Sequence, residues 1–496
     1  MPKQANPTLS KTRFLSGLQC PKKLWTEVHA RDLIPPVDPA IQSRFDQGHA
    51  VGSLAKRLFP GGLEIGPGVR QWDRVVEDTR RALTQRRPLY EAAFRSGGAA
   101  CRVDILVPVD SNRWDALEVK STTGVKDVHH QDLALQAYVL AGSGLDIRDF
   151  CVVHLNTSYV RHGDLDLEAL FTRSRVTEEV QARQEIVRSR LDEMQEVLQG
   201  TSRPEIAIGR YCDEPYSCSL KKECWSFLPP ANVFDLALDK RRGFELLSEG
   251  IVDLHEIPLT ADLETKQQIQ LETVQSGIPR VDREALTRFL RSLDYPLYYF
   301  DIETVGPAIP LFDNSRPYQQ IPFLFSIHRV EKPGEVARHY AYMFGGKGDP
   351  RSDFLRATRT SLGSSGSIVA YNAPFEKRVL QDCAKSILEL EDWASELSDR
   401  FVDLLQPFRE FWYHHPDQLG SASLKSVLTP LTGMSYADLE ISDGEAASRE
   451  YLRVMSDEID PVERARVLRQ LEAYCSLDTL GMVAIVDKLQ EITVRA

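Results

Sequence analysis

An aromatic run in the second half of the chain ends in two acids: Tyr298-Tyr299-Phe300-Asp301-Ile302-Glu303-Thr304. Its composition is typical of a buried β-strand. Because successive side chains of a strand alternate between its two faces, Asp301 and Glu303 point to the same face. Carboxylate oxygens are the ligands that Mg²⁺ and Mn²⁺ prefer. The stretch therefore predicts an α/β domain with a carboxylate metal site at this strand.

Two later segments carry further acids. Residues 367–371 read as a strand, and Asn372-Ala373-Pro374 as the turn into a helix that contains Glu376. Tyr474 and Asp478 lie one helical turn apart near the C-terminus, so both project from one helix face.

The three segments resemble, in order, the motifs of the DnaQ-like (DEDD) superfamily of 3′–5′ exonucleases, which has a ribonuclease-H-like fold. The matches are Asp301-x-Glu303 for the first motif, Asn372-x-x-Phe375 for the second, and Tyr474-x3-Asp478 for the tyrosine (DEDDy) variety of the third. The family usually has Asp after the Phe, whereas this chain has Glu376. The resemblance implies that Asp301, Glu303 and Asp478 bind two metal ions and that Tyr474 orients the attacking water.

Two other features of this half leave alternatives open. Ser423-Leu424-Lys425 resembles a stretch that faces substrate in related exonucleases. Asp403 either supports the metal site or simply begins a helix. The alternative for the whole half is an exonuclease fold that has lost catalysis and only binds.

The first half contains a second set of carboxylates. Residues 100–107 read as a strand, residues 110–112 as a turn, and residues 114–120 as the next strand. Glu118 and Lys120 share one strand face, and Asp104 approaches that face if the strands pair as a hairpin. Two acids and a lysine are suited to metal-assisted phosphodiester hydrolysis. The alternative is a surface hairpin with ordinary charges.

These residues resemble the RecB-like branch of the PD-(D/E)XK nucleases. The matches are Asp104, Glu118-Val119-Lys120 and, on a helix expected near 129–141, Gln136-Ala137-Tyr138. The spacing of the last motif is shorter than usual, and Asp132 stands where the family often has Gln. The resemblance implies that His49, on an upstream helix, is a metal ligand with Asp104 and Glu118. An exposed histidine without such a role is the alternative.

Cys212, Cys218 and Cys224 are evenly spaced among polar residues, and Cys20 lies far upstream. Four thiolates can hold an iron–sulfur cluster or a tetrahedral zinc ion, although the spacing is wider than that of zinc ribbons. Cys20, in the context Cys20-Pro21-x-x-Leu24-Trp25, and the three later cysteines resemble the ligands of iron–sulfur RecB-like nucleases. That resemblance implies a structural [4Fe–4S] cluster. Scattered buried thiols are the alternative, and the remaining four cysteines read as core residues.

The chain has 496 residues, which is too long for a single core, and a net charge of −12. We expect a RecB-like domain at 1–230, a helical linker at 231–292 and a DnaQ-like domain at 293–496. The linker is either a spacer or a small helical unit that contacts phosphate. Neither a signal peptide nor a membrane span is evident, so we expect a cytoplasmic protein without membrane contact.

The combination resembles a bacterial family that joins a RecB-like module to a DnaQ-like domain. It implies a nuclease that uses Mg²⁺ or Mn²⁺ to hydrolyse DNA, in DNA repair or processing or in anti-phage defence. The first alternative is a ribonuclease that trims RNA 3′ ends. The second is a non-catalytic scaffold that binds nucleic acid through decayed sites.

Overall fold

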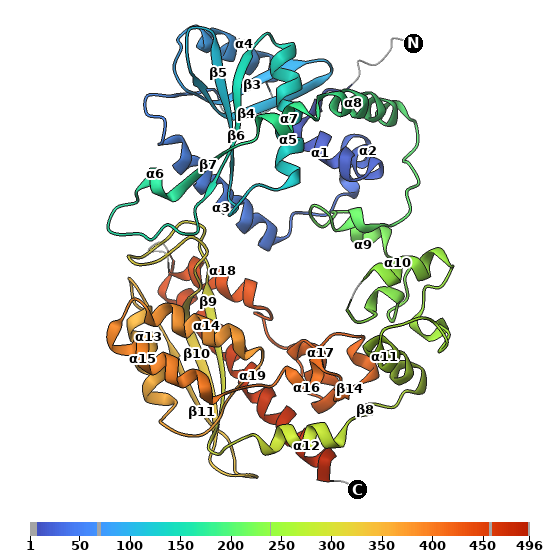
Figure 1. Cartoon of the computed structure of the whole chain (residues 1–496), viewed down its shortest axis with the longest axis vertical. Helices are drawn as coiled ribbons and strands as arrows, with labels where there is room; N and C mark the ends of the chain where they lie inside the picture. Colours follow the sequence, from blue (N-terminus) through green and yellow to red (C-terminus); the bar gives the residue numbers. More distant parts are fainter. Residues whose placement is uncertain (1–6, 67–70, 239, 456–458, 495–496) are drawn as a thin grey trace. The chain divides into compact units, whose positions relative to one another are not determined.

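The computed structural model describes residues 7–66, 71–238, 240–455 and 459–494 (Figure 1). It is an α/β protein with two mixed sheets and a further two-stranded pair. The chain forms two compact units. The first unit consists of residues 1–226 and 307–318, and the second of residues 227–306 and 319–496.

The first unit is built on one mixed sheet. Its strands follow the order β2-β3-β4-β5-β6-β7, with β1 pairing parallel to β4. Pairs β3–β4, β4–β5 and β6–β7 are antiparallel, whereas β5–β6 is parallel. The strands are β1 (Leu9–Ser10), β2 (Leu63–Glu64), β3 (Leu89–Ser96), β4 (Ala99–Pro108), β5 (Arg113–Lys120), β6 (Asp146–Leu155) and β7 (Phe171–Arg175).

Helices surround this sheet. They are α1 (Lys11–Gln19), α2 (Pro21–His29), α3 (Pro39–Lys56), α4 (Trp72–Leu83), α5 (Asp127–Gly142), α6 (Leu167–Leu170), α7 (Thr177–Gln181), α8 (Gln184–Gln199) and α9 (Lys221–Cys224). On one sheet face, Trp114 and Ala116 of β5 join the buried core that α1, α5 and α8 complete. On the other face, Leu117 packs with Val51 of α3. The alternation of β5 therefore puts Glu118 on the face covered by α5.

The expected hairpin is confirmed, because β4 and β5 pair with Ile105 opposite Leu117. The carboxylate of Asp110 stabilises its turn by accepting the backbone N–H groups of Asn112 and Arg113. Strand β7 pairs antiparallel with β6 inside a stretch, residues 165–200, whose composition is otherwise helical. Helix formers on both sides of this short edge strand dominate the composition, so periodicity alone does not reveal it.

One segment of the first unit comes from beyond residue 226. Residues 307–318 connect two strands of the second unit but cluster with the first. Arg161 donates to the carbonyls of Pro310, at 3.0 Å, and Leu311, at 2.8 Å. The Tyr318 hydroxyl donates to the carbonyl of Ser121, the residue after Lys120. The segment is thus bonded to the end of β5.

The second unit contains a five-stranded sheet in the order β11-β10-β9-β12-β13. Strand β9 pairs antiparallel with β10 and parallel with β12. The strands are β9 (Leu297–Val305), β10 (Ile321–Val330), β11 (Arg338–Met343), β12 (Ile368–Ala370) and β13 (Phe401–Asp403), and the separate pair is β8 (Arg280–Val281) with β14 (Tyr413–His414).

Helices of the second unit pack on both faces of this sheet. They are α10 (Lys240–Ser248), α11 (Thr265–Ser276), α12 (Arg283–Arg291), α13 (Arg351–Ser361), α14 (Ala373–Ala384), α15 (Leu388–Leu397), α16 (Gln406–Arg409), α17 (Leu424–Thr432), α18 (Gly444–Val454) and α19 (Pro461–Val494). The expected linker at 231–292 is helical, as α10–α12, and belongs to this unit.

Side chains of β9 alternate between the two faces of the sheet, and this decides which of them lie near the acids of the helices. Tyr298, Phe300 and Ile302 point into a core shared with α13, α14 and α15. The opposite face, which carries Asp301, is covered by α19. There, Thr479 of α19 bonds to Ser326, at 2.7 Å, and to His328, at 2.8 Å. Strand β9 thus presents its acids to the long C-terminal helix.

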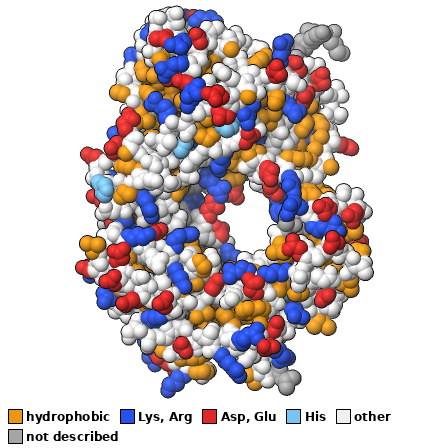
Figure 2. Space-filling view, in the orientation of Figure 1, with side chains coloured by type: hydrophobic (Ala, Val, Ile, Leu, Met, Phe, Trp, Pro, Cys, Tyr) orange, Lys and Arg blue, Asp and Glu red, His pale blue; other side chains and the backbone are white. Residues whose placement is uncertain are grey.

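The described surface is polar and of mixed charge. Figure 2 shows basic and acidic side chains interspersed over the face in view. Among the described helices, none combines the length and apolar character that crossing a membrane requires.

Candidate functional site

The first centre is built around Glu118, which is 1% exposed. Its Oε1 accepts hydrogen bonds from Lys120 Nζ and Lys11 Nζ, each at 2.7 Å. Its Oε2 accepts one from Gln136 Nε2, also at 2.7 Å. Strand β5 supplies Glu118 and Lys120, α5 supplies Gln136, and α1 supplies Lys11. The buried carboxylate is therefore balanced by two ammonium groups and one amide.

Two more acids complete this centre. Asp132 of α5 lies 2.9 Å from Lys120 Nζ and 3.6 Å from Lys11 Nζ, and it accepts a bond from Gln136 at 3.0 Å. Asp104 of β4 accepts the backbone N–H of Val119 at 2.8 Å. The predicted residues Asp104, Glu118, Lys120 and Gln136 thus converge.

Burial and neighbouring charges shift the pKa values of the two acids Asp104 and Glu118 in opposite directions. Burial opposes ionisation of Glu118, but Lys11 and Lys120 outweigh it and hold the pKa of this carboxyl well below its usual range. Burial and the charge of Glu118 raise the pKa of Asp104 to about 7. Burial would lower the pKa of Lys120, but Glu118 and Asp132 raise it above its usual value. Lys120 is therefore a stable ammonium and cannot act as a general base.

Lys11 is a residue of this centre that sequence reasoning missed. It lies 107 positions before Glu118 and begins α1. A cation at the first residue of a helix faces the positive end of the helix dipole, which is locally unfavourable. That unfavourable placement is a weak signal in the sequence, and the tertiary contact with Glu118 explains it.

Two predicted residues lie apart from these contacts. Tyr138 follows Gln136 by two positions, so it projects from a different face of α5. Its ring packs on the core and reaches the position that a Cβ at Gly97 would occupy. His49 is exposed on α3, and within the described chain it forms no three-donor group with the acids. Its role as a metal ligand stays a prediction.

The four predicted cysteines gather around one small cavity of the first unit. Cys20, Cys212, Cys218 and Cys224 all line it. Cys20 ends α1, and the neighbouring Gln19 amide donates to the carbonyls of Tyr211, at 2.8 Å, and Tyr216, at 2.7 Å. Burial raises the pKa of Cys20, and the nearby thiols raise it further. The donor set suits a metal group held by thiolates.

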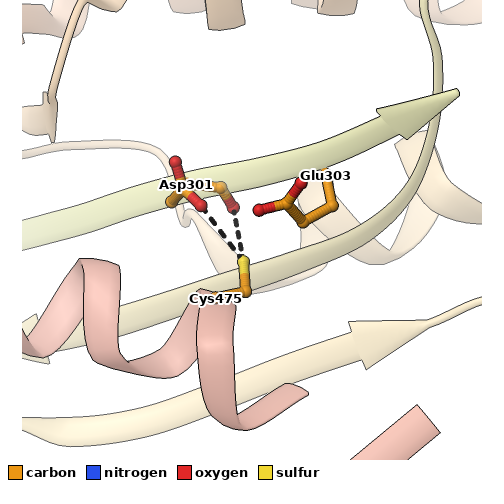
Figure 3. Close-up of side chains that lie close together, drawn as sticks. All are labelled: Asp301, Glu303 and Cys475. Atoms are coloured by element: carbon orange, nitrogen blue, oxygen red, sulfur yellow. Dashed lines mark hydrogen bonds between the residues drawn. The ribbon is translucent and has the colours of Figure 1, made fainter. Parts of the chain in front are cut away.

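The second centre begins with two acids on β9 and one thiol on α19. Asp301, Glu303 and Cys475 place one donor atom each within 4.8 Å of one another (Figure 3). Cys475 Sγ donates to Asp301 Oδ2 at 3.2 Å. Among the described residues, this is the one group of three such donors at that spacing, so the four cysteines of the first unit are more widely spaced. Cys475 was expected to be a core residue, and it is buried but bonded to an acid.

Helix α19 also brings Tyr474 and Asp478 to this centre. Both residues are buried, and the Tyr474 hydroxyl bonds to Asp478. The Tyr436 hydroxyl donates to Asp478 Oδ1. Lys425 lies over the rings of Tyr436, at 5.2 Å, and Tyr474, at 5.6 Å. Tyr436 carries no motif that sequence reasoning could have used.

Glu376 reaches the same centre from α14. Asn372, which precedes this helix, adopts a left-handed conformation (φ 76°), and its N–H donates to Asp403 Oδ1 at 3.0 Å. Asp403 also accepts the N–H of Leu405 at 3.1 Å. Asp403 therefore holds the turn that positions Glu376. The Oε2 of Glu376 is buried and has no hydrogen-bond partner among the described residues.

Burial is the main cause of the raised pKa values in the second centre, and repulsion between its carboxylates adds to it. Burial raises the pKa of Asp301 to about 6. Burial, and then the charge of Asp301, raise the pKa values of Glu303, Glu376 and Asp478 well above their usual range. Lys425 partly offsets this for Glu303 and Asp478. Three buried acids and the half-buried Asp301, with one unpartnered oxygen on Glu376, fit divalent cations, because hard cations take oxygen ligands.

Comparisons with known proteins cover part of this centre. Residues 298–423 match the family model described as "Domain of unknown function (DUF2779)". That range contains Asp301, Glu303 and Glu376 but not Asp478, and of the first unit it contains only residues 307–318. The chain is also 26% identical to "Uncharacterized protein MG366" of Mycoplasma genitalium, over 39% of this chain. The matched part is 32% of the relative's own length.

Proposed function

We propose that this protein is a divalent-metal-dependent nuclease with two active centres. The first unit resembles a RecB-like PD-(D/E)XK domain, and the second a DnaQ-like exonuclease domain of ribonuclease-H-like fold. The proposed substrate is DNA, and the proposed context is repair, processing or anti-phage defence. The single observation that carries the proposal is the convergence of Asp301, Glu303, Glu376 and Asp478, because clustered acids with raised pKa values are suited to bind cations in place of protons.

In the second centre, Asp301, Glu303, Glu376 and Asp478 would hold two metal ions. Bound metal would supply an activated water and stabilise the leaving 3′ oxygen of the phosphodiester. Burial raises the pKa of Tyr474 far above its usual value, so its hydroxyl stays protonated and donates. Tyr474 can therefore orient the attacking water but cannot deprotonate it. Tyr436 fixes the orientation of Asp478.

In the first centre, Asp104, Glu118 and Asp132 would hold the metal. Lys120 remains an ammonium, so it would orient the attacking water and stabilise the charge that develops on the phosphate. Gln136 fixes Glu118 through one oxygen, which leaves the carboxylate a single orientation. His49 would add a ligand only by turning inward from its exposed position on α3.

The four-cysteine group (Cys20, Cys212, Cys218 and Cys224) is proposed to hold a [4Fe–4S] cluster. In a zinc tetrahedron the sulfurs stand about 3.8 Å apart, because each Zn–S bond is about 2.3 Å. The four thiols around one cavity and their resemblance to the ligands of iron–sulfur RecB-like nucleases support the cluster. Anaerobically purified protein should be brown and contain iron and sulfide. Colourless protein with stoichiometric zinc would overturn this assignment.

A cleavage assay tests the nuclease proposal. Labelled single- and double-stranded DNA, with matched RNA, is incubated with Mg²⁺ or Mn²⁺ and the wild type, Lys120→Ala, Asp301→Ala or the double variant. We expect each single variant to lose one cleavage mode and the double variant to lose both. RNA cleavage alone would replace DNA with RNA as the substrate. Binding without cleavage by the wild type would sink the proposal in favour of a scaffold.

A further inference from the structure

The first centre already contains two cations. Lys11 and Lys120 both place Nζ 2.7 Å from the same oxygen of Glu118, and both contact Asp132. Lys120 shares its strand with Glu118, so its place follows from local geometry. Lys11 arrives on α1, where Ser10 caps the helix by accepting the N–H of Arg13 at 3.3 Å. The fold thus brings a second ammonium group from a separate element.

Charge counting limits what this centre can accept. Asp104, Glu118 and Asp132 supply three negative charges when ionised, and Lys11 and Lys120 supply two positive charges. The remainder is one negative charge. One divalent cation makes the centre singly positive, which complements the single negative charge of a phosphodiester. Two divalent cations would make it triply positive, and buried unbalanced charge is costly.

The second centre has the opposite balance. Asp301, Glu303, Glu376 and Asp478 supply four negative charges when ionised, and Lys425 is the cation that acts on Glu303 and Asp478. Asp443 and Asp403 add negative charge beside Glu303 and Glu376. At least three negative charges therefore remain, against one in the first centre. The second centre thus has enough negative charge for two divalent cations, and the first has enough for one.

We propose that the first centre binds a single divalent cation and that the Lys11 ammonium supplies the positive charge that a second metal ion would otherwise provide. This inference rests on the proposed metal-dependent function of the first centre. Lys11 is then a positioning residue, because it acts through the two proposed ligands that it contacts, Glu118 and Asp132. The inference also explains why Glu118 Oε1 accepts hydrogen bonds from two ammonium groups. The second ammonium group, that of Lys11, occupies the place of a metal ion.

Manganese binding tests the inference without any cleavage assay. The second centre is first silenced by Asp301→Asn with Asp478→Asn, and bound Mn²⁺ is counted by calorimetry and by electron paramagnetic resonance. We expect one isolated ion in this background protein. Adding Lys11→Met should admit a second ion, and two ions about 4 Å apart give an exchange-coupled spectrum. Lys11→Arg keeps the charge and should keep one ion.

Thr12→Ala, at the exposed neighbouring position of α1, is the matched control and should leave one ion. Circular dichroism verifies that each variant is folded. If Lys11→Met does not fold, Lys11→Gln in the background protein answers the question, because it removes the charge but keeps a hydrogen-bond donor and should also admit a second ion. Two ions in the background protein, or one in folded Lys11→Met, would overturn the inference. Correct ion counts without cleavage would contradict the proposed function alone.

Discussion

The two carboxylate centres differ in how the protein balances their charge. In the first, Glu118 is held by Lys11, Lys120 and Gln136, and its pKa falls well below the usual range. In the second, burial raises the pKa of Asp301 to about 6, and its bonded partner is the Cys475 thiol. The acids of the first centre are therefore balanced by its own side chains, whereas those of the second are only partly offset by Lys425. The pKa of a carboxyl group in this protein is thus lowered or raised according to the charges that surround it.

The largest expected effect is on catalysis, and it distinguishes the activity of one centre from that of the other. Asp478→Asn should lower trimming of 3′ ends by about a thousandfold, because it removes a proposed metal ligand from a site whose acids Lys425 only partly balances. Lys120→Met should lower the other cleavage mode by about a hundredfold or more, because it removes a charge donor. Each is measured on end-labelled and on circular DNA. Loss of both modes in either variant would mean that the centres are not independent.

The next effect is on stability in the absence of metal. Glu118→Gln should lower the free energy of unfolding by about 3 kcal/mol, because it leaves two buried ammonium groups without their carboxylate. Asp478→Asn should raise it by about 1 kcal/mol, because it removes one of several repelling acids. Calorimetry in the presence of a chelator measures both. If both substitutions changed the free energy of unfolding in the same direction, the two centres would not differ in charge balance as described.

The pH dependence of stability should also differ in sign. Folding raises the pKa of Asp301 to about 6. An unfolded aspartate titrates near pH 4, so metal-free protein loses stability as pH rises from about 4 to about 6. Asp301→Asn should remove about 1–2 kcal/mol of that loss.

Glu118 is the matched comparison, because its pKa is lowered. Its contribution to stability is present at neutral pH and is lost as pH falls below about 4. The destabilisation by Glu118→Gln should therefore shrink on acidification. Denaturant titrations of metal-free protein at several pH values measure both dependences, and parallel curves for the two variants would contradict the sign argument.

The smallest effect concerns the thiol of the second centre. Cys475→Ser keeps a donor beside Asp301 and should change cleavage less than about threefold, because one neutral hydrogen bond contributes little net free energy. Steady-state rates with Mg²⁺ measure the change. A loss of tenfold or more would mean that the sulfur does more than hold Asp301 in place.

The sequence predicted what is local in each centre and missed what is distant. Alternation along β9 and the β4–β5 hairpin follow from short patterns, so Asp301, Glu303 and Glu118 could be placed on strand faces. Lys11 and Tyr436 could not, because their partners lie 107 and 42 positions away. Strand β7 was missed because edge pairing with β6 overrides the helical composition of its surroundings. The positions of the acids were thus predictable, and the groups that set their charge were not.

Residues 307–318 have a consequence for synthesis on the ribosome. Domains usually fold from the N-terminus as the chain emerges, at about 5–20 residues per second. Here the first unit contains a segment that emerges only after β9 has been made, and Tyr318 of this segment bonds next to Lys120. The N-terminal unit therefore cannot complete its fold during translation until the ribosome has passed residue 318. A stop codon after residue 226 would leave that unit without its last piece.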